Sequence, residues 1–461
     1  MDCGSTGTRV HLFRTDANGK VSEFSPPSDE DAKLLEVEPG ISSFAEHPED
    51  AQAYMATLLA EATRWVPVAA QSQTRVHALA TAGMRLLSAA VQAPVWAAIE
   101  SALKASPFAY TSGDAYTISG NFEGLFNWLA IKYILSNAPP GLGGLDLGGA
   151  SMQIAFAQPE GGSILEDAYF MTRNGTTAHV YSHSYMRMGT NEAHSRLVQM
   201  LANDEDAQAG ALLPSLANPC LNPGYQTTQI VACPSEGDKL CTRQIHGTGD
   251  WQACNALTTR LMHHEYECLL PPCAAMGVYQ PSAKGVQFYA VSAFFYTVNG
   301  LGLAPWKGEW RGSSRQIADT ATSFCARPYS EIIAADKYAG GFCFNSAHIV
   351  SLLSVLGIGD ESSSVAFSRK VDGFTVSWPL GAQLYFGAEQ RCKIYSRLGT
   401  HSALTNGEVA DLQGNLQASV AGQTPFTHFL PFAASIAIMA IALPLLIHRS
   451  MKHRHPFRSI V

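Results

Sequence analysis

One short motif occurs twice in this chain, and it limits the possible folds more than any other feature. The sequence DCGSTGTRVHLF begins at Asp2, and DLGGASMQIAF begins at Asp146. Each copy runs from an aspartate through glycine and small residues into alternating apolar residues, which is the pattern of a turn followed by a strand. Two similar loops predict two similar halves, and 461 residues are enough for two domains with a cleft between them.

Strand and helix patterns alternate along the first part of the chain, which indicates an α/β layer structure. Apolar spacing predicts helices at 50–66, 91–103 and 121–135, and strands at 10–13 and 76–79, with a strand, glycine turn and strand over 144–156.

The later part of the chain is less regular. Residues 204–281 are rich in Pro, Asn, Gly and Cys, so we expect irregular structure held by cross-links, without a core of its own. Apolar patterning returns at 288–296 and 341–358, and the second stretch predicts a buried helix from Ser346 onward.

The ten cysteines are unevenly placed. Cys3 stands alone in the first 219 residues, and the other nine fall between Cys220 and Cys392. The cluster contains no C-x2-C pair, which argues against a zinc ribbon and favours disulfides. Disulfides imply an oxidising compartment for this part of the protein.

A membrane anchor is predicted near the carboxyl end. Residues 429–447 carry no charge and are about long enough to cross a bilayer as a helix, although a buried or amphipathic helix is an alternative. Arginine and lysine residues follow directly, so the tail at 448–461 is expected in the cytoplasm and the body outside it. Asn174-Gly-Thr is a glycosylation sequon that agrees with this orientation.

The amino end does not match an exported protein, because no signal peptide precedes the first motif. We expect that an upstream segment is missing, and the alternative is that the carboxyl-terminal anchor alone directs insertion.

The repeated loops have the chemistry of a phosphate site. In an Asp-x-Gly turn, successive amide N–H groups can point into one space and bind phosphate oxygens without a formal positive charge. The net charge of -8 offers no general attraction for anions and argues against a nucleic-acid partner. Hydroxyl groups could add donors, and two aspartates suit a divalent cation. A glycine-rich hairpin with a solvated aspartate is the plain alternative for either loop. The residues concerned are Ser5, Thr6, Thr8 and Ser151 for the hydroxyls, and Asp2 and Asp146 for the cation.

Hydrolysis needs a base that deprotonates water, and Glu123 is the best candidate. It lies in the first turn of the helix predicted from about Asn121, where the helix dipole favours the ionised carboxylate. A glutamate that only stabilises the helix end is the alternative.

Taken together, five motifs in order resemble the ecto-nucleoside triphosphate diphosphohydrolases, the apyrase family. The matching stretches are DCGSTGTRV from Asp2, ATAGMRLL from Ala80, GNFEGLFNWLAIKYIL from Gly120, LDLGGASMQI from Leu145, and Tyr338 through GFCF to Leu356. The resemblance spans most of the chain.

The resemblance implies an α/β fold of two actin-like (ribonuclease H-like) domains with the nucleotide between them, and a carboxyl-terminal transmembrane helix. The implied boundaries are a first lobe at 1–119, a second lobe with a disulfide-rich insertion at 120–375, a return to the first lobe at 376–401, a stalk at 402–428, the membrane helix at 429–447 and the tail at 448–461.

Residue roles are also implied by the resemblance. Glu123 would be the catalytic base, Ser151 and Gln153 would hold the attacking water, and Thr81 would close the site near the terminal phosphate. Tyr296 would stack on the nucleobase, although a lone aromatic residue is as often part of a core. Asp2 and Asp146 would organise Ca²⁺ or Mg²⁺ through water. The phosphate loops would be Ser5, Thr6, Gly7 and Thr8, and Gly148, Gly149 and Ala150.

By likeness the disulfides would be Cys220–Cys254, Cys268–Cys273 and Cys325–Cys343. The family commonly has a cysteine near SHSYMRMG, where this chain has none, so we expect Cys241 to pair with Cys233 instead. We expect Cys3 to be a small buried residue, and Cys392 has no evident partner.

The expected function is metal-dependent hydrolysis of the terminal phosphate of nucleoside tri- or diphosphates, or both, outside the cytoplasm. The membrane could be the cell surface or a secretory organelle, and the oligomeric state is open. One alternative is an actin-like ATPase, sugar kinase or chaperone, and another is an inactive membrane glycoprotein used for nucleotide sensing or adhesion.

Overall fold

The computed structural model describes residues 1–396 apart from short gaps at 17–18, 25–34, 136, 159–162, 174–175, 234–238, 264–266, 359–364, 372–373 and 388–391. The expected stalk, membrane helix and tail, as well as the sequon asparagine, lie outside the described residues. Within the described residues no helix combines the length and the apolar character that a membrane crossing requires.

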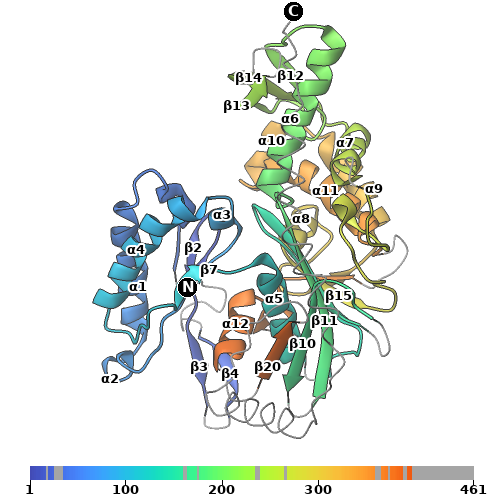
Figure 1. The fold of residues 1–461 in the computed structure, drawn as a ribbon. Coiled ribbons are helices and arrows are strands. Elements are labelled where there is room, and N and C mark those ends of the chain that lie inside the picture. The colour runs from blue at the N-terminus through green and yellow to red at the C-terminus, as the bar shows by residue number, and fades with distance from the viewer. Residues whose placement is uncertain are drawn as a thin grey trace, which may run out of the picture. The chain divides into compact units, whose positions relative to one another are not determined.

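The first lobe is a five-stranded sheet with helices against it. The strand order is β5-β2-β1-β6-β7, and helices α1 and α4 lie side by side over it (Figure 1). Their apolar side chains, such as Met55 and Ile99, form one core with Ala78 and Ala80 of β6. The bounds are β1 Asp2–Cys3, β2 Thr8–Val10, β5 Leu35–Val37, η1 Ile41–Phe44, α1 Asp50–Trp65, α2 Val68–Gln71, β6 Ala78–Ala80, α3 Ala82–Arg85, α4 Ala89–Ala105 and β7 Ala115–Thr117.

A small hairpin extends from the first lobe to the second. Strands β3 (Phe13–Thr15) and β4 (Val21–Glu23) pair with each other. The backbone N–H of Val21 donates to the Tyr133 hydroxyl at 2.7 Å, and that hydroxyl donates to the Val21 carbonyl at 2.9 Å. Because Tyr133 lies on helix α5 of the second lobe, this hairpin ties the two lobes together.

The second lobe is an eight-stranded sheet in the order β16-β17-β15-β8-β9-β11-β10-β20. Helices α5 and α12 cover one face, and α7, α8, α9 and α11 pack on the other side, around the largest core (Figure 1). The strands are β8 Leu142–Leu147, β9 Ser151–Ala157, β10 Ala168–Arg173, β11 Thr176–Met186, β15 Gln287–Ser292, β16 Glu309–Arg311, β17 Val365–Ser368 and β20 Cys392–Ser396, and a separate hairpin joins β18 Lys370–Val371 to β19 Phe374–Thr375. The helices are α5 Gly120–Ile134, α6 Thr190–Ala209, α7 Trp251–His263, η3 Ala275–Gly277, α8 Ala293–Gly300, α9 Ser314–Cys325, α10 Tyr329–Ala335, η4 Ala339–Gly341, α11 Phe342–Val355 and α12 Trp378–Gly387.

The repeated motif forms the same substructure in both lobes. Strand β1 is antiparallel to β2 and parallel to β6, and β8 is antiparallel to β9 and parallel to β15. Even the register agrees, since Asp2 lies opposite Arg9 and Asp146 lies opposite Gln153, seven residues further along in each case. Both aspartates therefore stand at the same place in equivalent sheets, as the two similar halves predict.

The prediction of irregular structure at residues 204–281 was wrong, whereas the expected cross-links are present in this segment. This segment contains a three-stranded sheet, β12 (Ser215–Asn218), β13 (Gln226–Cys233) and β14 (Lys239–Gly247), as well as α7. A separate small core lies between this sheet and α6. The strand pattern is weak in the sequence because one face of β13 and β14 is exposed and carries mostly polar residues, so few apolar positions repeat.

The expected return to the first lobe at 376–401 is seen only in part. Helix α12 packs on α5 and reaches Leu79 of the first lobe through Trp378 and Ala382. Strand β20 instead pairs with β10 at the edge of the second sheet. A strand at the edge of a sheet exposes unpaired backbone N–H and C=O groups, and β20 supplies hydrogen-bond partners for those of β10.

Disulfides join Cys220 to Cys254, Cys233 to Cys241, Cys268 to Cys273, and Cys325 to Cys343. These are the pairs that the resemblance implied, including the replacement pairing of Cys241. Cys3 is a buried free thiol in the first core.

Candidate active site

The first glycine loop turns the chain from β1 into β2. The N–H of Gly4 donates to the carbonyl of Gly7 at 2.9 Å, which closes the turn. The motif ATAGMRLL packs against the side of this loop. A Cβ atom at Gly83 in that motif would lie 2.8 Å from the Cα of Ser5. Only a glycine at this position lets α3 approach the loop so closely.

The second glycine loop turns the chain from β8 into β9, and the start of α6 holds it. The N–H groups of Thr190 and Asn191 donate to the carbonyls of Gly148 and Gly149, both at 2.9 Å. A Cβ atom at Gly149 would lie 2.9 Å from Oγ of Ser5. The two glycine loops therefore face each other across a narrow gap, with one loop from each lobe.

Glu123 lies on α5 beside this gap. The helix begins after Ser119, whose hydroxyl accepts a hydrogen bond from the N–H of Phe122 at 3.3 Å. This cap places Glu123 in the first turn, where its side chain is only 10% exposed. Its Oε2 accepts hydrogen bonds from Arg85 at 2.8 Å and from Gln153 at 3.3 Å.

Ser151 and Gln153 complete a hydrogen-bonded group around that carboxylate. The Gln153 amide nitrogen donates to Oγ of Ser151 at 2.6 Å and to Oγ of Ser184 at 2.9 Å. Since Ser151 and Gln153 are two residues apart on β9, their side chains project from the same face of the sheet. The sequence prediction that Glu123, Ser151 and Gln153 act together agrees with this contact geometry.

Arg85 is a member of the site that the sequence interpretation missed. Its guanidinium group donates to Glu123, to Oγ of Ser151 at 3.1 Å and to the carbonyl of Ile118 at 3.1 Å. A basic residue inside the quoted motif ATAGMRLL was the available signal, because a buried arginine needs a carboxylate partner.

A second missed group supports the start of α5. The Asn121 amide nitrogen donates to Oδ1 of Asp167 at 2.8 Å, and Nδ1 of His183 lies 2.5 Å from Oδ2 of the same carboxylate. Oδ1 of Asn121 accepts from the N–H of Ser184 at 3.0 Å. No motif links these residues in the sequence, since they come together only when β11 packs beside α5.

The three acidic residues of the site act on one another electrostatically. Burial raises the pKa of Glu123 to about 7, against the lowering effect of Arg85, and the charges of Asp146 and Asp2 raise it further. Burial also raises the pKa of Asp146 to about 6, and Asp2 adds to that rise. The pKa of Asp2 is itself raised by burial, although Arg9 lowers it. The carboxylates of Asp2, Asp146 and Glu123 thus share one site.

The donor set at this site fits a hard divalent cation. Asp146 is buried and Asp2 is half-buried, and the two come from opposite lobes, where the charge of Asp2 raises the pKa of Asp146. A cation near these two carboxyl groups would lower their pKa and so favour their ionised forms. No group of three or more acidic, histidine or cysteine ligands occurs in the described part of the chain. The remaining ligands would be water and phosphate oxygens, which is the usual situation of Mg²⁺.

The other sequence candidates are placed as follows. Thr81 is buried at the end of β6, and its N–H donates to the carbonyl of Cys3 at 3.2 Å, so it lies beside the first loop. Thr6 is exposed in that loop. Thr8 is fully buried beside Cys3 and Tyr54, and its role as a phosphate ligand stays a prediction.

Tyr296 lies on α8 and is 40% exposed. Its ring lies 6.2 Å from that of Trp306, and Arg369 lies over the Trp306 ring at 4.5 Å. It belongs to a partly exposed aromatic group and is not part of the cluster around Glu123.

Comparison with known proteins identifies the family. Residues 1–397 match the model of the GDA1/CD39 (nucleoside phosphatase) family. The chain belongs to this family. As a GDA1/CD39 nucleoside phosphatase it is an enzyme that hydrolyses phosphate from nucleotides.

Curated relatives agree with this GDA1/CD39 assignment. The chain is 29% identical to mouse ectonucleoside triphosphate diphosphohydrolase 1 over 421 residues, covering 83% of this chain and 79% of the relative. It is 31% identical to bovine ectonucleoside triphosphate diphosphohydrolase 8 over 424 residues, covering 83% and 81%. It is 30% identical to probable apyrase 6 of Arabidopsis thaliana over 406 residues, covering 83% and 70%.

Among solved structures, the crystal structure of nucleoside triphosphate hydrolases from Neospora caninum superposes with a TM-score of 0.60. That match covers 83% of this GDA1/CD39 chain and 91% of the other, at 17% sequence identity. It shows that the two proteins share a fold.

Proposed function

We propose that this nucleoside phosphatase removes the terminal phosphate from nucleoside triphosphates, diphosphates or both, by direct attack of water and with the help of a divalent cation. The observation that carries the proposal is the group of Glu123, Gln153 and Ser151 beside two facing glycine loops. Arg85 also contacts this group, and two aspartates nearby suit a cation.

In this proposal the backbone of the two loops binds the phosphates. Their amide groups donate to phosphate oxygens without adding formal charge, as a nest does. Ser5, Thr6 and Gly7 come from one lobe, and Gly148, Gly149 and Ala150 come from the other. The terminal phosphate is thereby held in the gap where the loops face each other, close to Glu123.

Glu123 is the proposed base. A pKa of about 7 leaves a carboxylate that is ionised above neutral pH and still basic enough to accept a proton from water. Ser151 and Gln153 orient that water opposite the bond that breaks. Asp2 and Asp146 hold a Ca²⁺ or Mg²⁺ shell through water, and the cation supplies charge stabilisation to the phosphates. Since attack is direct, positioning and electrostatics account for most of the catalysis.

The proposed location is outside the cytoplasm, with residues 429–447 anchoring the protein in a membrane of the cell surface or of a secretory organelle. The disulfides support this, because they persist in oxidising compartments. The sequence hypothesis of an inactive glycoprotein has less support, because the hydrogen-bonded group around Glu123 is intact.

The decisive experiment measures phosphate release from ATP, ADP, GDP and UDP, with and without a chelator. We compare the unchanged chain with Glu123→Gln, which keeps the shape of the side chain and removes the base. Activity is expected to fall at least ~10²-fold in the variant and to be lost on chelation.

The matched control is Glu100→Gln, which changes a partly exposed glutamate paired with Lys104. It is expected to retain full activity. Turnover that survives both chelation and Glu123→Gln would contradict the proposal.

A further inference from the structure

The fifth motif of the sequence, Tyr338 through Leu356, plays no part in the proposed chemistry, yet it contains a fully buried histidine. His348 lies on α11. Its Nε2 donates to the carbonyl of Met188 at 2.8 Å, although the two residues are 160 positions apart in the sequence. Because a polar side chain is costly in an apolar core, this hydrogen bond between distant segments requires an explanation.

The Met188 carbonyl belongs to a segment, residues 187–191, that holds the second glycine loop. The N–H of Arg187 donates to the carbonyl of Ala150 at 2.8 Å, and the start of α6 binds the carbonyls of the two loop glycines, as described above. A Cβ atom at Gly189 would lie 2.4 Å from the backbone nitrogen of Ala150. All three loop residues are therefore held by residues 187–191, which we call the clamp segment.

His348 fixes the middle of the clamp segment. Met188 is fully buried, and Arg187 before it has a φ of 62°, in the left-handed region that residues with a side chain rarely adopt. Such a backbone conformation persists only where the surroundings determine it. The hydrogen bond from His348 is one such determinant, and only one residue separates it from the contacts to the loop on either side.

The ring of His348 is a donor at neutral pH. Burial lowers its pKa to about 4, and the charge of Arg196 lowers it further, so the ring is neutral and carries one N–H. A carbonyl oxygen can only accept, which places this hydrogen on Nε2. Nδ1 is buried and has no hydrogen-bond partner within the described part of the chain. A residue that served packing alone would not need to bury that nitrogen.

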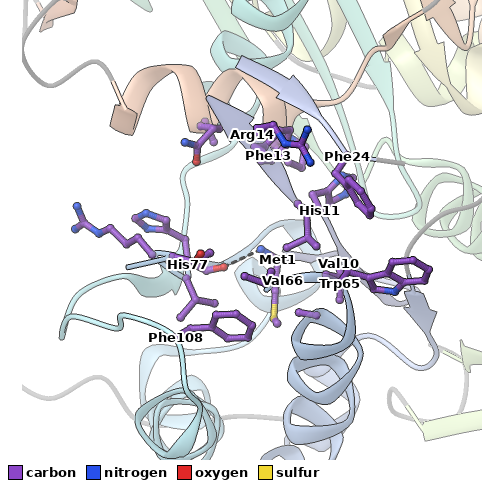
Figure 2. A pocket seen from close by; sticks show the side chains of 18 of the residues that line it. Met1, Val10, His11, Phe13, Arg14, Phe24, Trp65, Val66, His77 and Phe108 are labelled. Carbon is purple, nitrogen blue, oxygen red and sulfur yellow. Dashed lines mark hydrogen bonds between the residues drawn. The ribbon is translucent and has the colours of Figure 1, made fainter. Parts of the chain in front are cut away.

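Another histidine whose pKa burial lowers to about 4 differs from His348 in its surroundings. His77 lines a pocket in the first lobe (Figure 2), and its Nδ1 lies 3.6 Å from Oδ1 of Asp114. A carboxylate at this distance favours the protonated ring. His348 instead stacks on the ring of Phe344, with the centroids 5.3 Å apart. Its surroundings therefore favour the neutral donor form.

We propose that His348 is a positioning residue for the second glycine loop, because its hydrogen bond to Met188 fixes the clamp segment and the clamp segment fixes the loop. This role rests on the proposed function, in which the amides of that loop bind phosphate. A loop that is ordered in advance loses less conformational freedom when it binds. The fifth motif thus serves the binding of the phosphate chain, whereas the group around Glu123 serves the attack of water.

The test compares three substitutions in the full chain. His348→Phe keeps a ring and removes the donor. His348→Asn keeps an amide that ends near the position of Nδ1 and does not reach Met188, whereas the longer amide of His348→Gln does. For the Phe and Asn variants we expect amide exchange of residues 187–191 to speed up at least ~10-fold. We expect their KM for ATP with Mg²⁺ to rise about 10-fold while kcat changes less than about 2-fold.

The Gln variant should return both quantities to within about 3-fold of the unchanged chain, because it restores the hydrogen bond. Ile349→Val is the matched control for stability. Ile349 is the next residue on α11 and is buried in the same core, so the loss of one methyl group weakens packing and leaves the hydrogen bond of His348 in place. Its exchange at residues 187–191 and its KM should equal those of the unchanged chain.

The proposal is overturned if the Phe and Asn variants behave like Ile349→Val, if glutamine restores neither quantity, or if exchange speeds up while KM stays constant. Exchange is measured without nucleotide. Its outcome is therefore separate from that of chelation and Glu123→Gln, which test the proposed function itself.

Discussion

At the scale of single residues, the ion pair between Arg85 and Glu123 decides how the proposed base behaves. Burial alone would leave the carboxyl group protonated over a wide pH range, and the guanidinium group at 2.8 Å opposes this. The result is a pKa of about 7. A base with such a pKa is ionised often enough to act and still binds a proton firmly.

The pH dependence of the enzyme follows from this pair. Glu123 accepts a proton only when ionised, so kcat/KM is expected to fall as the pH drops through about 7. Arg85→Gln removes the charge that lowers this pKa, and the acidic limb should move to higher pH by about one unit. The measurement is a pH profile of kcat/KM for phosphate release.

Arg64→Gln is the matched control for that profile, because Arg64 is exposed and pairs with the neighbouring Glu61, away from the site. Its profile should overlay that of the unchanged chain. If the acidic limb of the kcat/KM profile lies at the same pH in Arg85→Gln as in the unchanged chain, Arg85 does not set the pKa of the base.

At the scale of elements, a polar group around Asn121 holds the start of α5. Asn121 bridges Asp167 and the backbone of Ser184, and His183 contacts the same aspartate. These contacts join the first turn of α5 to β11. They thereby fix the direction in which Glu123 points.

Removing this support should affect turnover more than binding. In Asn121→Ala the first turn of α5 loses its tie to Asp167, and small displacements of a reacting group are costly. We expect kcat to fall about 10-fold or more while KM changes little. Steady-state kinetics with ATP and ADP measure both constants.

Asn203→Ala serves as control, since Asn203 lies on α6 and its amide oxygen accepts from Gln199 on the surface. An increase of KM at constant kcat in Asn121→Ala would mean that the group acts on nucleotide binding and not on the base.

Elements with strong apolar periodicity were predictable from the sequence. Helix α5 was expected at 121–135 and runs Gly120–Ile134, and α1 was expected at 50–66 and runs Asp50–Trp65. Strands β13 and β14 were missed because their exposed face carries polar residues. For the same reason the small core of the insertion was not foreseen.

The candidate site was predictable only where a motif carries it. Glu123, Ser151 and Gln153 lie in contiguous motifs, and the structure brings them into contact. Arg85 was overlooked although it lies in a motif, because its partner is 38 residues away in the sequence. Asp167 and His183 lie in no motif, and only the pairing of strands reveals them.

At the scale of the whole molecule, one disulfide ties the disulfide-rich insertion to the large core of the second lobe. Cys220, at the start of the insertion, is joined to Cys254 of α7 across 34 residues, and both lie in the large core. A cross-link that closes a loop of this length is expected to stabilise the fold by about 4 kcal/mol, chiefly by restricting the unfolded chain.

The double variant Cys220→Ala with Cys254→Ala should therefore lose about 4 kcal/mol of unfolding free energy. Urea unfolding without reductant measures this loss. Activity at low temperature should remain, since neither cysteine takes part in the hydrogen bonds around Glu123. A variant as stable as the unchanged chain would show that packing alone holds α7 in place.

The repeated glycine turn affects the direction in which a phosphate chain binds. A phosphate chain lying between two copies of the same backbone turn meets nearly the same amide dipoles from either side. The backbone alone therefore does little to distinguish one end of the phosphate chain from the other. At matching register the first copy carries Arg9 and the second carries Gln153. In the proposed function, unlike side chains such as these distinguish the two ends of the substrate.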